Sequence, residues 1–413
     1  MDLTIHHARV ENAEQIINAG IAGGKIVALQ EDELPAGQIA IEADGAIVSP
    51  AFVDPHFHLE NALLSDAVNQ SGSLREAINI YAEIKRDMSR ENIVARATRA
   101  LRMAVANGTL WMRNNVDIDQ IAKVRLLDAI CEACDRFAGV IDVQIVAFPQ
   151  LGLARNPEAV DLMWQAMTRG ATVVGGMPHG ERNMDDAARH IEIAFKIAKA
   201  HDADIDMHID ETDDPYWHTL ELLADKTIEA GYQDRVTAGH CCAMAAWDDT
   251  LAARVIEKVQ RAGVNICTNS PVNLLLQGRG DRQPVRRGIA RVRELLDAGV
   301  NVTCGQDDMM NMFYPFGHMD MLEVANFVAH AALLSSPSHI QAAFDMPRYR
   351  AARVLRLPNY GLHLGAAADL VLIPARSATE ALAQQPIRSY VIRQGLIVAH
   401  NRVQAEFGPQ VPA

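Results

Sequence analysis

The amino-acid sequence predicts an α/β protein: a (β/α)8 barrel of the TIM type with a small β-sandwich domain formed from both termini. Three observations support this. Apolar runs of strand length alternate with helical patterns eight times through the middle of the chain, the count of such a barrel. The first fifty residues are short segments of alternating apolar and polar residues, separated by Gly and Asp, and the same pattern recurs after residue 365. A chain of 413 residues is long enough for one large and one small domain.

We therefore assign residues 1–50 and 360–413 to a discontinuous β-domain and residues 51–359 to a metal-dependent catalytic barrel. The barrel strands are expected at 52–58, 110–116, 142–148, 172–178, 204–210, 235–240, 264–269 and 300–307. Helical patterns lie between them, for example at 74–88, 188–202 and 291–299. The last of these ends at Gly299, a residue typical of a helix C-terminus.

The composition disfavours some classes of partner. A formal net charge of −14 and a pI of about 5.5 argue against nucleic acid and anionic membranes. We expect no signal peptide and no membrane span, because no basic segment precedes an apolar core and no apolar run reaches 18 residues. Cys131 and Cys134 lie in a helical pattern without a second pair, which predicts half-buried helix cysteines and not a metal site. We expect a cytoplasmic homo-oligomer that acts on a small molecule.

The segment "SPAFVDPHFHLEN" at 49–61 places two imidazoles at the end of an apolar run. Residues two apart in a strand point to the same side, so His56 and His58 should project into one space. Two neutral imidazoles that converge can form half of a metal shell. A lone His-x-His is more often an accident of the surface or core, so the interpretation depends on further ligands.

Further polar residues follow other predicted strands, at the barrel end where catalysis occurs. They are Gln150 after the third strand, His208 and Glu211 at the fifth, His240 at the sixth, and Asp307 and Asp308 at the eighth. Singly, each has an ordinary structural interpretation, such as a hydrogen-bonded core histidine or a solvated turn. Together, at the ends of four strands, they indicate a site, since buried polar groups are costly without partners.

Three histidines and a carboxylate favour a divalent ion, zinc or iron(II). A water at an open position would have a pKa of about 7. No lysine stands at the end of the third or fourth predicted strand to bridge two ions, so we expect one metal per chain.

Several blocks resemble the amidohydrolase superfamily and, within it, the bacterial cytosine deaminases. They include "HFHLE", "AFPQ", "HIDETDD", "NLLLQGR", "RRGI" and "GQDDMMNMFYPFGHMDML", and the resemblance covers nearly the whole chain. The His-x-His pair is common to the superfamily, whereas "AFPQ", "NLLLQGR" and "RRGI" are much narrower. The resemblance implies that the metal ligands are His56, His58, His208 and Asp307.

The same resemblance implies roles for the remaining residues. Gln150 would grip the amide edge of a pyrimidine, Glu211 would shuttle protons to the ring nitrogen, and His240 would lie beside the hydrolytic water. Asp307 would share in catalysis, and the expected substrate contacts also include Asp308, Phe148 and Phe313. The implied reaction is hydrolytic deamination of cytosine or a close aminopyrimidine by a metal-bound hydroxide, with release of ammonia.

Three positions depart from the family pattern: Asn115 stands for His, Glu60 for Asp, and Phe313 for Trp. The smaller Phe313 predicts a roomier pocket that could accept 5-methylcytosine. Two alternatives stay open. One is an s-triazine N-alkylaminohydrolase of the same superfamily, against which "NLLLQGR" and "RRGI" argue. The other is a metal- or ligand-binding protein without turnover, which would not need the acid–base pair of Glu211 and His240.

Overall fold

The computed structural model describes residues 1–10 and 15–406. Residues 11–14 and 407–413, which fall within the predicted β-domain, lie outside the described residues. The chain divides into two compact units. The first contains Met1–Ala51, Val105–Gly108 and Asn359–Ala413, and the second contains Phe52–Ala104 and Thr109–Pro358.

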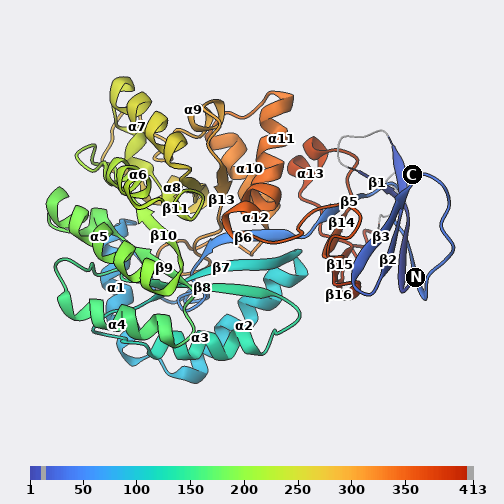
Figure 1. The fold of residues 1–413 in the computed structure, drawn as a ribbon, viewed down its shortest axis with the longest axis horizontal. Helices are drawn as coiled ribbons and strands as arrows, with labels where there is room; N and C mark the ends of the chain where they lie inside the picture. The colour runs from blue at the N-terminus through green and yellow to red at the C-terminus, as the bar shows by residue number, and fades with distance from the viewer. Residues whose placement is uncertain (11–14, 407–413) are drawn as a thin grey trace. The chain divides into compact units, whose positions relative to one another are not determined.

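The second unit is built on eight parallel strands that pair in the order of the sequence (Figure 1). They are β6 (Phe52–Phe57), β7 (Thr109–Asp117), β8 (Asp142–Phe148), β9 (Val173–Gly176), β10 (Asp204–Ile209), β11 (Val236–His240), β12 (Asn265–Thr268) and β13 (Val302–Cys304). A parallel bridge between Phe57 and Asp307 joins the last strand region to the first, which nearly closes the barrel. The predicted (β/α)8 fold is confirmed.

Helices follow the strands and cover the outside of the barrel (Figure 1). They are α1 (Leu74–Asp87), α2 (Arg90–Ala106), α3 (Arg125–Asp135), α4 (Pro157–Thr168), α5 (Met184–His201), α6 (Thr219–Ala230), α7 (Asp249–Ala262), α8 (Ser270–Leu276), α9 (Val292–Asp297), α10 (Met321–Ala331), α11 (Pro337–Asp345) and α12 (Ala351–Val354). Short helical turns are η1 (Pro178–Gly180), η2 (Cys242–Ala245) and η3 (Met346–Arg350). The α3 helix carries Cys131 and Cys134, both free and partly buried, as predicted.

Local sequence explains where several of these helices begin and end. The side chains of Ser73, Asn183 and Asp248 each accept a hydrogen bond from a backbone N–H in the first turn of α1, α5 and α7. Gly231 and Gly263 end α6 and α7 in the left-handed conformation, which glycine adopts without a Cβ penalty. These signals fix the lengths of the barrel helices and so the places where the loops of the site start.

The first unit contains a sheet made from both ends of the chain. Its strands are β1 (Leu3–Arg9), β2 (Ile16–Ala22), β3 (Lys25–Gln30), β4 (Ile39–Glu42), β5 (Ile47–Pro50), β14 (Leu370–Ile373), β15 (Tyr390–Arg393) and β16 (Leu396–His400), with helix α13 (Ala378–Gln384). The order is β16-β15-β14-β5-β1-β2-β3, with β4 beside β1. Antiparallel pairing of β5 with β14 joins the two termini, as the β-domain prediction requires. Its core contains Leu3, Ile5, Val48, Leu370 and Leu372.

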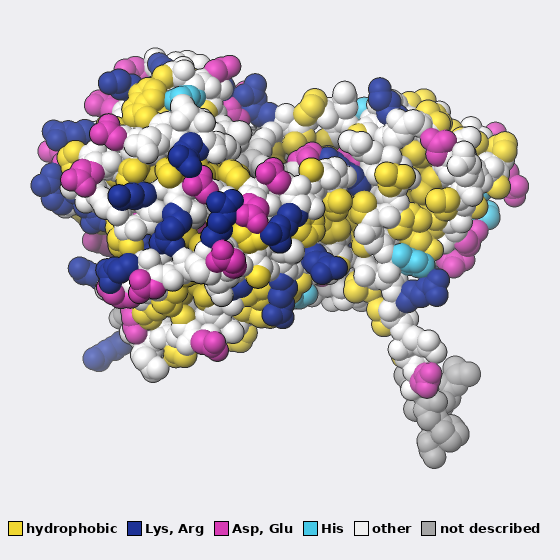
Figure 2. Space-filling model, turned by 90° about the horizontal axis from the view of Figure 1, so that it is seen from below, with side chains coloured by type: hydrophobic (Ala, Val, Ile, Leu, Met, Phe, Trp, Pro, Cys, Tyr) yellow, Lys and Arg dark blue, Asp and Glu magenta, His cyan; other side chains and the backbone are white. Residues whose placement is uncertain are grey.

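The surface of the described residues carries both signs of charge. Figure 2 shows lysine and arginine side chains interspersed with aspartate and glutamate on the face in view. Within the described residues, 1–10 and 15–406, no helix is both long enough and apolar enough to cross a membrane.

Candidate active site

Four predicted ligands converge at the carboxyl ends of three barrel strands. His56 and His58 come from the end of β6, His208 from β10, and Asp307 from the loop after β13. Nε2 of His208 lies 3.3 Å from Nε2 of His56 and 3.1 Å from Nε2 of His58. Oδ1 of Asp307 lies 3.4 Å and 3.6 Å from the same two nitrogens. All four side chains are buried, so the sequence-predicted ligand set is brought together in one dry space.

The spacing of these donor atoms fits a metal ion. Four ligands placed tetrahedrally at about 2.0–2.2 Å from an ion are separated from one another by roughly 3.3–3.6 Å. Three of the four separations, 3.3, 3.4 and 3.6 Å, lie in this range, and the fourth, between His58 and His208, is 0.2 Å shorter at 3.1 Å. Imidazole and carboxylate donors suit zinc and iron(II). These residues can therefore hold one divalent ion.

His240 lies close enough to be considered as a ligand too, because one nitrogen of His240 and donors of His56, His208 and Asp307 lie within 4.8 Å of one another. Both its ring nitrogens, however, face amide groups: Nε2 lies 3.2 Å from Asn269 Nδ2 and Nδ1 lies 3.1 Å from Asn273 Nδ2. Nε2 of His58 lies 3.1 Å from Nε2 of His208 and 3.6 Å from Oδ1 of Asp307. His58 therefore stays the predicted fourth ligand, and His240 would lie beside a bound ion.

Two carboxylates face the far sides of the ligand rings. Asp206 Oδ1 lies 3.8 Å from Nδ1 of His56, and Glu60 Oε1 lies 3.7 Å from Nδ1 of His58. Carboxylates in this position orient ligand imidazoles and raise their basicity. Arg113 inside the barrel pairs with Asp206 at 3.0 Å. Sequence reasoning missed Asp206, although its place two residues before His208 on the same strand face was a usable signal.

Glu211 stands outside the donor group but close to it. Its Oε1 lies 3.4 Å from Nδ1 of His240 and 3.5 Å from Nδ2 of Asn273. Burial raises the pKa of Glu211 well above its usual value, and the charges of Asp307 and Asp308 raise it further. Burial lowers the pKa of His240 to about 3. A carboxyl with a raised pKa beside a neutral imidazole is suited to proton transfer.

The two adjacent aspartates have opposite properties. Burial alone would raise the pKa of Asp307, but His240 and the hydrogen bond from His56 outweigh it and leave the pKa at about 2. Burial and the charge of Asp307 raise the pKa of Asp308 to about 7. Asp308 accepts a hydrogen bond of 2.6 Å from Nδ2 of Asn311. Asp307 is thus available as an ionised ligand, while Asp308 can hold a proton.

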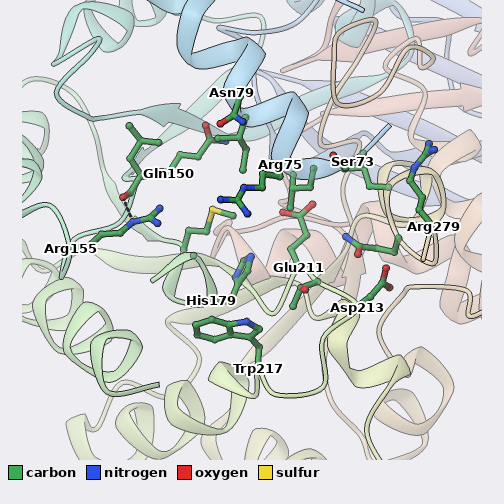
Figure 3. A pocket seen from close by; sticks show the side chains of 18 of the residues that line it. Ser73, Arg75, Asn79, Gln150, Arg155, His179, Glu211, Asp213, Trp217 and Arg279 are labelled. Atoms are coloured by element: carbon green, nitrogen blue, oxygen red, sulfur yellow. Dashed lines mark hydrogen bonds between the residues drawn. The ribbon is translucent and has the colours of Figure 1, made fainter. Parts of the chain in front are cut away.

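A small inner cavity of about 20 Å³ lies against these groups and is lined by His58, Asn61, Leu74, Gln150, Met177, His208, Glu211, His240, Asp307, Asp308 and Phe313. An outer pocket of about 890 Å³ shares Leu74, Gln150, Met177 and Glu211 with it (Figure 3). Oε1 of Gln150 is buried and has no hydrogen-bond partner among the described residues. That amide is therefore free to bind a molecule that enters through the outer pocket.

Of the two predicted aromatic substrate contacts, Phe313 and Phe148, one lines the inner cavity and the other does not. Phe313 lines the inner cavity and meets the Tyr81 ring edge-on, with ring centroids 6.2 Å apart. Phe148 does not line it: its ring stacks on His208 at a centroid distance of 4.0 Å and an angle of 19°. The structure therefore places Phe148 behind a ligand ring, where it fixes the orientation of the imidazole. His179, which the sequence analysis did not select, is buried and lines the outer pocket.

The chain is similar to known proteins over most of its length. Residues 138–399 match the model of a family described as "Amidohydrolase family". The chain is 28% identical to N-isopropylammelide isopropyl amidohydrolase of Pseudomonas sp. (strain ADP), over 97% of this chain and 98% of that protein. It is 30% identical to pterin deaminase of Rhizobium rhizogenes, over 90% and 86%. It is also similar to the crystal structure of 5-methylcytosine deaminase from Klebsiella pneumoniae liganded with 5-fluorocytosine. That match has a TM-score of 0.95 and 31% identity, and covers 99% of this chain and 100% of the other.

Proposed function

The chain belongs to the amidohydrolase family and is a hydrolase of C–N bonds, and we propose that it deaminates cytosine and 5-methylcytosine to the oxo-pyrimidine and ammonia. The observation that carries this proposal is the full-length similarity to 5-methylcytosine deaminase. It is supported by the inner cavity, which brings Gln150 and Glu211 to the metal-ligand group. That cavity, of about 20 Å³, has room for about one water, so the base would be bound from the outer pocket of about 890 Å³, which Gln150 and Glu211 also line.

The protein residues divide the chemical work. When bound, one zinc or iron(II) ion, held by His56, His58, His208 and Asp307, would activate the attacking water. Gln150 offers one donor and one acceptor to the amide edge of the base. In the proposed reaction a water oxygen adds to the carbon that bears the amine, and the C–NH2 bond then breaks.

Two protons must move during this reaction. Both come from the attacking water: Glu211 would pass one to the ring nitrogen as the water oxygen adds, and would then take the remaining hydroxyl proton of the adduct and pass it to the amine, which leaves as ammonia. His240, neutral and 3.4 Å from Glu211, would hold the oxygen of the attacking water in place. Asp308, with its pKa near 7, would contact the amine side of the base. Such acid–base assistance is typically worth about 10²–10⁴-fold in rate.

The runner-up is release of an alkylamine from an s-triazine, which the 28% identity to N-isopropylammelide isopropyl amidohydrolase favours. The outer pocket of about 890 Å³ has room for an alkyl substituent or for a bicyclic base. We nevertheless place the pyrimidine first, because the structural match to 5-methylcytosine deaminase has a TM-score of 0.95 and 31% identity, against 0.84 and 27% for N-isopropylammelide isopropylaminohydrolase from Burkholderia multivorans. We also propose that the protein is a homo-oligomer in the cytoplasm.

The test is identification of both products. Purified protein loaded with zinc or iron(II) would be incubated with cytosine, 5-methylcytosine, pterin and N-isopropylammelide. Ammonia, isopropylamine and the ring products would be measured by mass spectrometry. The proposal expects uracil and thymine with one ammonia each. Release of isopropylamine without deamination of either cytosine would move the chain to the triazine branch, and no turnover with any metal would favour the binding-protein alternative.

A further inference from the structure

A buried pair outside the donor group connects two loops of the pocket. Glu181 follows η1 after β9, and His190 lies on α5. Oε1 of Glu181 lies 2.8 Å from Nδ1 of His190, and neither side chain is exposed. Neither residue lines either cavity described above. A buried carboxylate–imidazole pair is costly unless its polar atoms are fully hydrogen-bonded, so its partners indicate its role.

The partners of Glu181 are three consecutive backbone N–H groups of the loop between β8 and α4. Leu153 donates to Oε1 at 2.7 Å, Ala154 donates to Oε1 at 2.9 Å, and Arg155 donates to Oε2 at 3.1 Å. This is the loop that begins with Gln150. Hydrogen bonds from N–H groups to a charged carboxylate are stronger than those between neutral groups. The carboxylate of Glu181 therefore fixes the backbone that carries the proposed base-binding amide.

His190 extends the same connection to the loop after β9. Met177 donates its backbone N–H to Nε2 of His190 at 3.2 Å. Nδ1 of His190 lies 2.8 Å from Oε1 of Glu181, so the neutral ring that accepts at Nε2 carries its proton on Nδ1 and donates it to Glu181. The N–H of Leu153 lies 3.3 Å from the same Nδ1 but only 2.7 Å from Oε1 of Glu181, which is therefore its acceptor. Met177 lines both cavities, as Gln150 does. One buried pair thus connects the two loops that supply Gln150 and Met177 to the lining of both cavities.

Two glycines make room for this pair. A Cβ on Gly152 would lie 2.7 Å from Oε1 of Glu181, and its φ of +89° is one that L side chains rarely adopt. A Cβ on Gly176 would lie 2.8 Å from Nε2 of His190. The backbone approaches the pair more closely than any larger residue allows, so both loops are shaped around Glu181 and His190.

We propose that Glu181 and His190 form a positioning pair that sets Gln150 and Met177 for recognition of the base. The pair does not touch substrate; it acts through the two loops. This inference rests on the proposed function for its substrate. It predicts that loosening the pair weakens binding of the base more than it slows the chemical step, because Glu211 and the metal ligands are held by other strands.

The test is a double-mutant cycle with Glu181→Gln and Gln150→Ala. The amide of Gln would turn an NH2 group toward backbone donors, so Glu181→Gln should raise KM roughly tenfold with kcat within about threefold of wild type. In the Gln150→Ala background the same change should raise KM less than about twofold, because the residue it positions is gone. Glu158→Gln, an exposed residue of α4, is the control and should change neither constant. An equal rise in KM in both backgrounds, or a loss of kcat at constant KM, would overturn the proposal.

Hydrogen exchange on the substrate-free protein supplies an independent measurement. In Glu181→Gln, the amides of Leu153, Ala154, Arg155 and Met177 should exchange at least about tenfold faster, while those of β10 keep their protection. Unchanged protection at 153–155, or loss of protection over the whole barrel, would each overturn the positioning role. If wild type converts no cytosine, the proposed function fails, and the exchange result still decides whether the pair holds the loops.

Discussion

Replacement of Glu211 by Gln should abolish most of the turnover and leave the fold and the metal site intact. Burial and the charges of Asp307 and Asp308 raise the pKa of Glu211, so the native side chain is suited to pass protons from the water to the ring nitrogen and the amine. An amide has nearly the same shape but no acidic proton. Loss of one general acid–base group costs about 10²–10⁴-fold in kcat, or roughly 2.7–5.4 kcal/mol of transition-state stabilisation.

The same geometry predicts what Glu211→Gln does not change. Glu211 is outside the donor group of His56, His58, His208 and Asp307, so metal content should stay near one ion per chain. Gln has nearly the same size and shape as Glu and replaces a carboxyl whose pKa is raised, so the free energy of unfolding should change by less than about 0.5 kcal/mol. The assay is steady-state ammonia release from 5-methylcytosine, with elemental analysis and urea unfolding on the same sample. A variant that keeps more than about a tenth of wild-type kcat, or that loses its metal, would refute the proton-transfer role.

Other predictions follow from the described contacts. Phe313→Trp should fill space beside the base and lower the kcat/KM ratio of 5-methylcytosine to cytosine by about fourfold, the worth of one buried methyl at roughly 0.8 kcal/mol; an unchanged ratio would exclude Phe313 from the pocket wall. Gln150→Ala should raise KM by an amount equivalent to about 1–3 kcal/mol, and unaltered binding would reassign Gln150 to packing. Arg113→Met leaves the charge of Asp206 buried and unpaired, so urea unfolding should show a loss of about 3–5 kcal/mol. The exposed Arg169→Ala control should lose no more than about 1 kcal/mol, and equal losses would contradict the burial argument. Removal of the metal with a chelator should lower Tm and abolish activity, and zinc or iron(II) should restore both; a chelated enzyme with full activity would exclude a metal role.

Much of the barrel could be predicted because its strands are short apolar runs bounded by helical patterns. The third predicted strand, 142–148, coincides with β8, and most other limits agree within two residues. The last strand is shorter than predicted, because β13 ends at Cys304 and Asp307 has a φ of +67°, outside the extended range. The polar residues that follow the apolar run break the strand and turn Asp307 toward the histidines.

The candidate ligands could be predicted because topology alone brings strand ends together. Residues that position another residue through a contact could not be predicted in this way. Glu181 lies in a loop and His190 on a helix, where glutamate and histidine are ordinary surface residues, and nothing in the sequence shows that both are buried. Phe148 was expected to contact substrate, but the direction of its ring depends on packing against His208, which the sequence pattern does not encode.

We propose that this hydrolase acts on the amine of a cytosine, and the most direct test is kcat/KM of the metal-loaded protein for 5-methylcytosine, pterin and N-isopropylammelide, compared side by side at one pH. We expect about 10⁴ M⁻¹ s⁻¹ or more for 5-methylcytosine and values at least tenfold lower for the other two. A kcat/KM for pterin or N-isopropylammelide that exceeds that for 5-methylcytosine would contradict it.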